Sequence, residues 1–126
     1  MDTISTERAP AAIGPYSQAV RSGDFLFCSG QIAIGPDTGK LVGDDIEGQT
    51  VQVINNLKAV LGAAALDLRH VVKTTVFLTD LGKFSIVNEI YAEAFDGHKP
   101  ARATVEVSKL PMGALIEIEC IAFLGR

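Results

Sequence analysis

Two segments near the end of the chain alternate apolar and polar residues with period two, the pattern of β-strands whose two faces differ. They cover residues 100–107 and 115–123. The polar positions of the first segment are Arg102, Thr104 and Glu106, and those of the second are Glu117 and Glu119. Pro111 and Gly113 lie between the segments and suit a reversal of direction. If the two strands pair as a hairpin, the register predicts that both sets of polar residues lie on one face.

The remaining chain alternates strand-like and helix-like patterns, with Asp44 or Asp45 able to cap the first helix and Asp80 the second. Strands are expected near residues 3–5, 19–21, 25–34 and 70–79, and helices over residues 46–64 and 84–95. With the two segments above, this order predicts an α+β fold: a mixed six-stranded sheet with two helices on one face. At 126 residues, the whole chain, 1–126, is expected to form a single domain.

Two helices cover only one face of such a sheet. The strand at residues 70–79 is nearly continuous in β-forming residues, and the last strand stays apolar beyond Glu119. A sheet face this apolar is expected to be covered by another subunit. The residues themselves therefore predict a homo-oligomer.

Composition narrows the classes of function. The net charge is −4, and no lysine or arginine stands next to another, which disfavours nucleic acid as a partner. Cys28 and Cys120 fall in apolar strand segments and are expected to be small buried residues in a reducing compartment. The first residues do not resemble a secretion signal, and no apolar run is long enough to cross a bilayer. A cytoplasmic location without membrane contact is expected.

The sequence contains no P-loop, no dinucleotide-binding glycine pattern and no Cys/His cluster at metal-binding spacing. His70 and His98 have no nucleophile at a recognisable spacing and are expected to be structural or solvated. Six candidate site residues remain: Tyr16, Ser29, Asn88, Arg102, Thr104 and Glu117.

The planar guanidinium of Arg102 suits bidentate binding of a carboxylate. The alternative is an internal ion pair with Glu117 or Glu119. An apolar pocket would raise the pKa of Glu117 toward a range useful for handling a proton of water. Tyr16 is either part of a site or an aromatic plug that packs its Pro- and Gly-rich loop against the body of the protein.

Several motifs together resemble the Rid family (the YjgF group), and specifically its RidA subfamily of reactive-intermediate imine deaminases. These are residues 9–18, Ser29-Gly30-Gln31, residues 72–78, Val87-Asn88 and the signature from Pro100 through Ile118. The resemblance spans essentially the whole chain. It implies a chorismate-mutase-like fold and a homotrimer with a central barrel, whose three sites lie in clefts between subunits.

The resemblance also implies an activity. The chain would be a hydrolase of C–N bonds other than peptide bonds, a 2-iminobutanoate/2-iminopropanoate deaminase acting on 2-imino and enamino acids released by pyridoxal-phosphate enzymes. Arg102 matches the arginine that binds the substrate carboxylate, and Glu117 matches the glutamate that positions water. Tyr16, Ser29 and Asn88 match residues that shape the pocket. Thr104 stands where many relatives have cysteine, and its backbone N–H is still able to donate to the carboxylate. No metal or other cofactor is implied, because a protonated imine carbon is already electrophilic.

Other functions stay open on sequence grounds. Some relatives are associated with ribonuclease activity or inhibition of translation, which the acidic composition disfavours. A non-catalytic module could use Arg102 to bind small carboxylates or to regulate a partner enzyme. No residue pattern in the sequence predicts or excludes a chaperone-like role.

Overall fold

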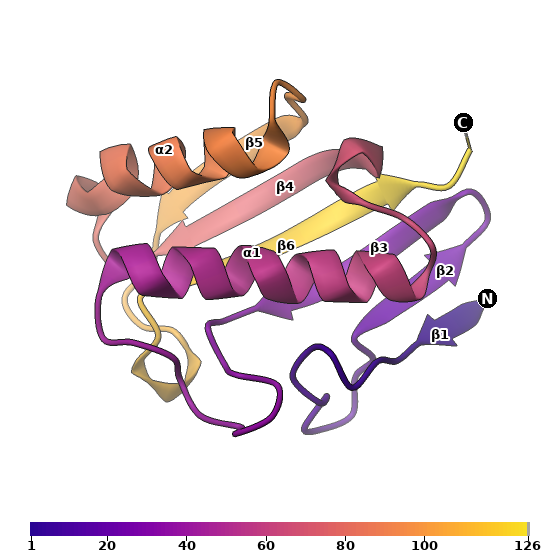
Figure 1. Ribbon diagram of the computed structural model, residues 1–126, viewed down its shortest axis with the longest axis horizontal. Helices are drawn as coiled ribbons and strands as arrows, with labels where there is room; N and C mark the ends of the chain where they lie inside the picture. Colours follow the sequence, from indigo (N-terminus) through magenta and orange to yellow (C-terminus); the bar gives the residue numbers. More distant parts are fainter. Residues whose placement is uncertain (126) are drawn as a thin grey trace.

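A computed structural model describes residues 1–125, which form one twisted sheet with both helices on the same face (Figure 1). The strands are β1 (Asp2–Ile4), β2 (Ala19–Ser22), β3 (Phe25–Gln31), β4 (Val71–Leu78), β5 (Ala101–Glu106) and β6 (Ile116–Phe123). The helices are α1 (Ile46–Ala63) and α2 (Phe84–Phe95). The predicted order of elements and the mixed six-stranded sheet with two helices on one face are confirmed.

The strands lie in the order β1-β2-β3-β6-β4-β5, and every neighbouring pair is antiparallel except β4 and β5. The parallel pair is joined by α2, which crosses back over the sheet as parallel connections require. β6 then inserts between β3 and β4 and becomes a central strand.

The predicted hairpin of β5 and β6 is wrong. Both strands pair with β4, on its opposite edges, and they do not pair with each other. Residues 107–115, which include the short 3₁₀ turn Pro111–Gly113, instead carry the chain past the end of β4. The parity argument that put Arg102 and Glu117 on one face therefore fails as well, with consequences for the site described below.

The core lies between the helices and the sheet, where aliphatic side chains of α1 pack against those of β3 and β6. Asp45 caps α1, because its Oδ1 accepts from the Gly48 N–H at 2.8 Å. Asp80 caps the 3₁₀ turn Leu81–Lys83 that runs directly into α2. Cys28 and Cys120 are free and buried, as predicted.

The other face of the sheet carries exposed apolar side chains. Phe25 and Phe27 alternate along β3 with the buried Leu26 and Cys28, so they point away from the helices, and both remain more than 40% exposed. Val105 on β5, whose register partner on β4 is Phe77, is 40% exposed. This is the uncovered apolar face that the sequence predicts. None of the helices in residues 1–125 has the length and apolarity needed to span a membrane.

β3 ends earlier than predicted. A register shift between Cys28 and Gln31 breaks its ladder with β6, and residues 32–34 leave the sheet. The carbonyl groups of Ile32 and Ile34 instead accept from the buried Asn56 Nδ2 of α1, at 3.1 and 2.9 Å. This diversion opens the space that holds the cavity described next.

Candidate functional site

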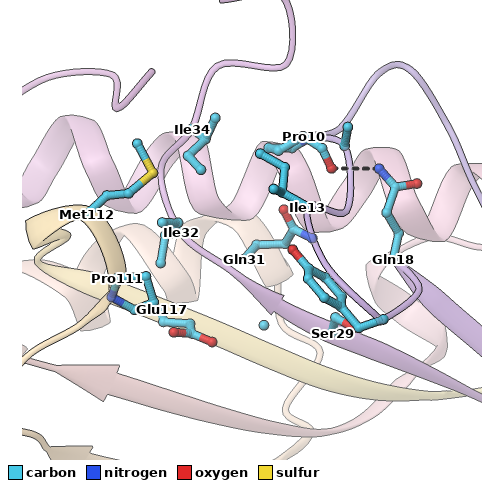
Figure 2. A pocket seen from close by; sticks show the side chains of 13 residues that line it. Pro10, Ile13, Gln18, Ser29, Gln31, Ile32, Ile34, Pro111, Met112 and Glu117 are labelled. Carbon is cyan, nitrogen blue, oxygen red and sulfur yellow. Dashed lines mark hydrogen bonds between the residues drawn. The ribbon is translucent and has the colours of Figure 1, made fainter. Parts of the chain in front are cut away.

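A cavity of about 490 Å³ lies where the N-terminal loop, the end of β3 and the turn before β6 meet (Figure 2). Its apolar lining comes from Pro10, Ala11, Ile13, Ile32, Ile34, Pro111 and Met112. Its polar lining comes from Tyr16, Gln18, Ser29, Gln31 and Glu117. A mostly apolar cavity with a few convergent polar groups is the usual form of a small-molecule site.

The carboxyl group of Glu117 lies directly against Gly30. A Cβ atom on residue 30 would overlap Glu117 Oε2 and lie 2.8 Å from its carboxyl carbon, so only glycine leaves room for this side chain. Partial burial raises the pKa of Glu117, and the negative charge of Glu119 raises it further. The carboxyl group therefore holds a proton more tightly than an exposed glutamate does, which favours a role in proton transfer.

Ser29 and Tyr16 border the same cavity. The Ser29 hydroxyl donates to the backbone oxygen of Ser17 at 2.6 Å, which ties the end of β3 to the N-terminal loop. Tyr16 remains 55% exposed and lines the cavity. This exposure contradicts the alternative in which Tyr16 plugs its loop into the body of the protein.

Arg102, the other principal candidate, lies on the helix-covered face of the edge strand β5. Its Nη1 donates to Asn88 Oδ1 of α2 at 2.8 Å. Its guanidinium carbon lies 4.9 Å from the ring centroid of Tyr91 and 5.1 Å from that of Phe84. Across the described part of the chain, no carboxylate lies within salt-bridge distance of this guanidinium, so the internal ion pair with Glu117 or Glu119 is not formed.

Thr104 follows Arg102 on the same face of β5, opposite the buried Val76 of β4. Its hydroxyl oxygen is buried and has no hydrogen-bond partner within residues 1–125. The structure therefore places Thr104 next to Arg102 but turns its hydroxyl inward.

The six candidate residues thus form two groups on opposite sides of the sheet. The cavity group consists of Tyr16, Ser29 and Glu117, and the arginine group consists of Asn88, Arg102 and Thr104. Glu117 alternates with the buried Ile116 and Ile118 along β6 and so points away from the helices. Arg102 packs under α2. A single chain does not bring the two groups together.

Sequence reasoning missed the residues that hold the cavity walls. Gln18 is 3% exposed; its Oε1 accepts from the Thr6 N–H, and its Nε2 donates to the carbonyl groups of Thr6 and Ala9. Its Nε2 also donates to the carbonyl group of Pro10, the bond drawn in Figure 2. Gln49, outside the lining of the cavity, is also buried; its Nε2 donates to the Gly43 carbonyl group and its Oε1 accepts from the Leu115 N–H, which joins two loops far apart in the sequence. A buried amide on an apolar face needs such partners, but the sequence does not say which loops supply them.

The histidines are structural, as predicted. His70 Nδ1 accepts from the Asp67 N–H at 3.1 Å, and His98 Nε2 lies 2.6 Å from the Val71 carbonyl oxygen. No set of three or more His, Cys, Asp or Glu side chains in residues 1–125 is placed to hold a metal ion.

A protein-family model described as Endoribonuclease L-PSP matches residues 6–124 of the chain. A RutC family protein of Pyrococcus horikoshii is 55% identical over 122 residues, which are 97% of each chain. Reactive Intermediate Deaminase A, chloroplastic, of Arabidopsis thaliana is 50% identical over 123 residues, covering 98% of this chain and 66% of that protein.

Among solved structures, E. coli TdcF with bound serine matches with a TM-score of 0.93 at 43% identity, and the match covers 98% of both chains. The agreement in motifs, in sequence and in fold extends over nearly the full length. The chain therefore belongs to the Rid family, the YjgF group that the L-PSP model also describes.

Proposed function

We propose that the protein is a 2-iminobutanoate/2-iminopropanoate deaminase, which hydrolyses the imines and enamines that pyridoxal-phosphate enzymes release in the cytoplasm. The observation that carries the proposal is the Arg102 guanidinium, which is fixed in place yet has no carboxylate partner in residues 1–125. The Arabidopsis relative named a reactive intermediate deaminase supports the same activity.

Hydrolysis needs a water oxygen, a place for its protons and a fixed substrate. Arg102 binds the substrate carboxylate through its free N–H donors, and Asn88 holds the guanidinium. Glu117 holds the attacking water and accepts its proton, a role that suits a carboxyl group of raised pKa. The water oxygen bonds to the imine carbon while the C=N π electron pair moves to nitrogen, which takes up the proton held by Glu117. The hydroxyl proton of the resulting carbinolamine then passes to the nitrogen, the C–N bond breaks, and ammonia leaves with the electron pair of that bond, so the 2-oxo acid remains.

This chemistry requires the cavity group and the arginine group in one site, and they lie on opposite sides of the sheet within a chain. We therefore place the site between neighbouring subunits of a homotrimer, with the cavity group from one subunit and the arginine group from the next. Burial of the exposed apolar face with Phe25, Phe27 and Val105 would stabilise the association of subunits.

The activity is tested by coupling the purified protein to a threonine dehydratase and timing the release of 2-oxobutanoate, with semicarbazide as a trap for the free imine. The wild-type protein should accelerate release, whereas Arg102→Ala and Glu117→Gln should each abolish the acceleration. No acceleration by the wild-type protein with imines from threonine or serine would overturn the proposal.

The location of the site has a separate test. Arg102→Ala and Glu117→Gln subunits, unfolded together and refolded as a mixture, should recover part of the wild-type activity, because some mixed interfaces pair an intact Arg102 with an intact Glu117. Each variant refolded alone should stay inactive. A mixture as inactive as its components would show that the two groups do not meet between subunits.

A non-catalytic module that binds small carboxylates is the second candidate, since Arg102 has no carboxylate partner within residues 1–125 and the similar E. coli TdcF structure has serine bound. The Glu117→Gln variant separates the two candidates. Binding of 2-oxobutanoate that survives in this variant, together with an inactive wild-type protein, would favour the module.

A further inference from the structure

The side chain of Arg102 is held by one face of α2. Phe84, Asn88 and Tyr91 follow the spacing i, i+4 and i+7, so their side chains lie along one side of this helix. The two rings contact the guanidinium, and the amide accepts one of its N–H bonds. An arginine on an exposed edge strand would otherwise extend its charged end into water.

The ring of Tyr91 is itself fixed. Its hydroxyl group shares a buried hydrogen bond of 2.7 Å with Thr74 Oγ1, and its ring stacks on Phe95 at 4.4 Å. Thr74 is fully buried and is the direct register partner of Arg102 in the β4–β5 pair. The hydrogen bond thus anchors α2 to the sheet next to the position from which the arginine extends.

We propose that Tyr91 and Phe84 are positioning residues that hold the Arg102 guanidinium in the orientation that binds the substrate carboxylate, with Thr74 locking Tyr91. This inference rests on the proposed function and deepens its account of substrate binding. A guanidinium has five N–H donors in a planar fork, and Asn88 accepts from only one of its terminal nitrogens. Ordering the side chain in advance removes an entropic cost that carboxylate binding would otherwise carry.

The first test measures the affinity for 2-oxobutanoate, the product, by isothermal titration calorimetry. At an exposed arginine, a cation–π contact corresponds to a change in affinity of about two- to fivefold. Tyr91→Leu and Phe84→Leu should weaken binding by about this factor. Tyr91→Phe, which keeps the ring and loses the bond to Thr74, should weaken it less. In hydrolysis assays the same variants should raise KM far more than they lower kcat.

Val87→Ala is the matched control, because Val87 is buried on the same helix and makes no cation–π contact or hydrogen bond with Arg102. It should destabilise the protein and leave the affinity for 2-oxobutanoate unchanged. An equal loss of affinity in Val87→Ala would mean that Tyr91 and Phe84 act only by stabilising the fold, and the inference would be wrong.

The second test needs no enzyme activity. The Nε–Hε signal of Arg102 in a ¹⁵N spectrum, assigned by its loss in Arg102→Lys, should lie in a position shifted by the two rings. Tyr91→Leu should move it toward the position of a mobile arginine, and Val87→Ala should not. An unchanged signal in Tyr91→Leu would overturn the inference.

The two proposals fail in different ways. A wild-type protein that binds 2-oxobutanoate through Tyr91 but hydrolyses no imine would overturn the deaminase and leave the positioning role standing. A deaminase whose affinity for 2-oxobutanoate is the same in Tyr91→Leu would overturn the positioning role alone. A wild-type protein with no affinity for 2-oxobutanoate would also overturn the positioning role, because that role is defined by binding of a carboxylate.

Discussion

Gly30 and Glu117 fit together so closely that the carboxyl group occupies the space a side chain at residue 30 would need. The glycine lies in the irregular end of β3, and the glutamate lies on β6, the neighbouring strand. Gly30 thus fixes where the proposed water-holding group of the site can lie. Gly30 leaves the space that the carboxyl group of Glu117 occupies, and it has no side chain that could take part in the chemistry.

Replacement of Gly30 by alanine should move the carboxyl group and leave the fold intact, because Gly30 does not have a positive φ and Glu117 is a flexible side chain. A displacement of about 1 Å in a catalytic group is able to reduce the rate about a hundredfold. Imine hydrolysis by Gly30→Ala should therefore fall by about ten- to a hundredfold, while the thermal midpoint changes by only a few degrees.

Gly62→Ala is the control for this substitution. A Cβ at Gly62, on the exposed side of α1, would have no neighbour within 4 Å. Alanine there should raise the free energy of unfolding by about 0.5–1 kcal/mol through helix propensity, with unchanged activity. Full activity in Gly30→Ala would contradict the role given to the close contact.

The raised pKa of Glu117 predicts a pH-dependent stability. The folded chain holds the proton of this carboxyl group more tightly than the unfolded chain, whose glutamates titrate near 4.5. The resulting stabilisation is fully present below that pH and is lost as pH rises through the folded pKa. Glu117→Gln has no proton to lose, so its free energy of unfolding relative to wild type should increase as pH rises above 4.5.

Urea unfolding at a fixed protomer concentration, repeated across this pH range, measures the effect. Glu119→Gln should shrink the pH-dependent part, because the charge of Glu119 contributes to the shift. Parallel pH profiles for the wild-type protein and Glu117→Gln would show that the folded and unfolded pKa values are equal.

Replacement by valine of two threonines on the helix-covered face of the sheet should change the free energy of unfolding in opposite directions. Thr104→Val removes a buried hydroxyl that has no partner in residues 1–125, and should raise the free energy of unfolding by about 1 kcal/mol. Thr74→Val leaves the buried hydroxyl of Tyr91 without its partner, and should lower the free energy of unfolding by about 1–2 kcal/mol. Chemical denaturation measures both, and a loss of stability in Thr104→Val would mean that its hydroxyl is bonded in solution.

Gln18 should control the order of the N-terminal loop. Gln18→Leu removes four hydrogen bonds and leaves the buried carbonyl of Ala9 and part-buried backbone groups of Thr6 and Pro10 unpaired, at a cost of about 2 kcal/mol or more. Hydrogen exchange in residues 6–10 should become much faster. Gln52→Leu, which removes a single bond to Asn56, serves as the control and should leave this loop protected.

Local patterns predicted the elements well. Period-two alternation located β5 and β6, helical spacing located α1, and the pair Asp44 and Asp45 marked where α1 begins, with Asp45 as the cap in the structure. The pairing of strands was predicted less well, because turn-forming residues between β5 and β6 are equally compatible with a hairpin and with the longer path around β4. The order of strands depends on the crossover through α2, which no short sequence window contains.

The same limit applies to the site. Residue type and motif selected Arg102, Asn88, Glu117 and Ser29 as candidates, since each carries a recognisable chemistry, and their roles stay predictions. Their division between two sides of the sheet depends on the β4–β5 register, which the sequence does not show. A glycine within a strand pattern is compatible with a bulge or with a close approach of another group, and the pattern alone does not show that the group lying against residue 30 is a glutamate of another strand.

The separation of Arg102 from Glu117 by the thickness of the sheet has a consequence for a newly synthesised chain. On the proposed function, a lone chain leaving the ribosome holds only half of each site and is chemically inert until it associates. Activity per chain depends on association with other copies of the protein, so dilution should abolish the activity without unfolding the chain.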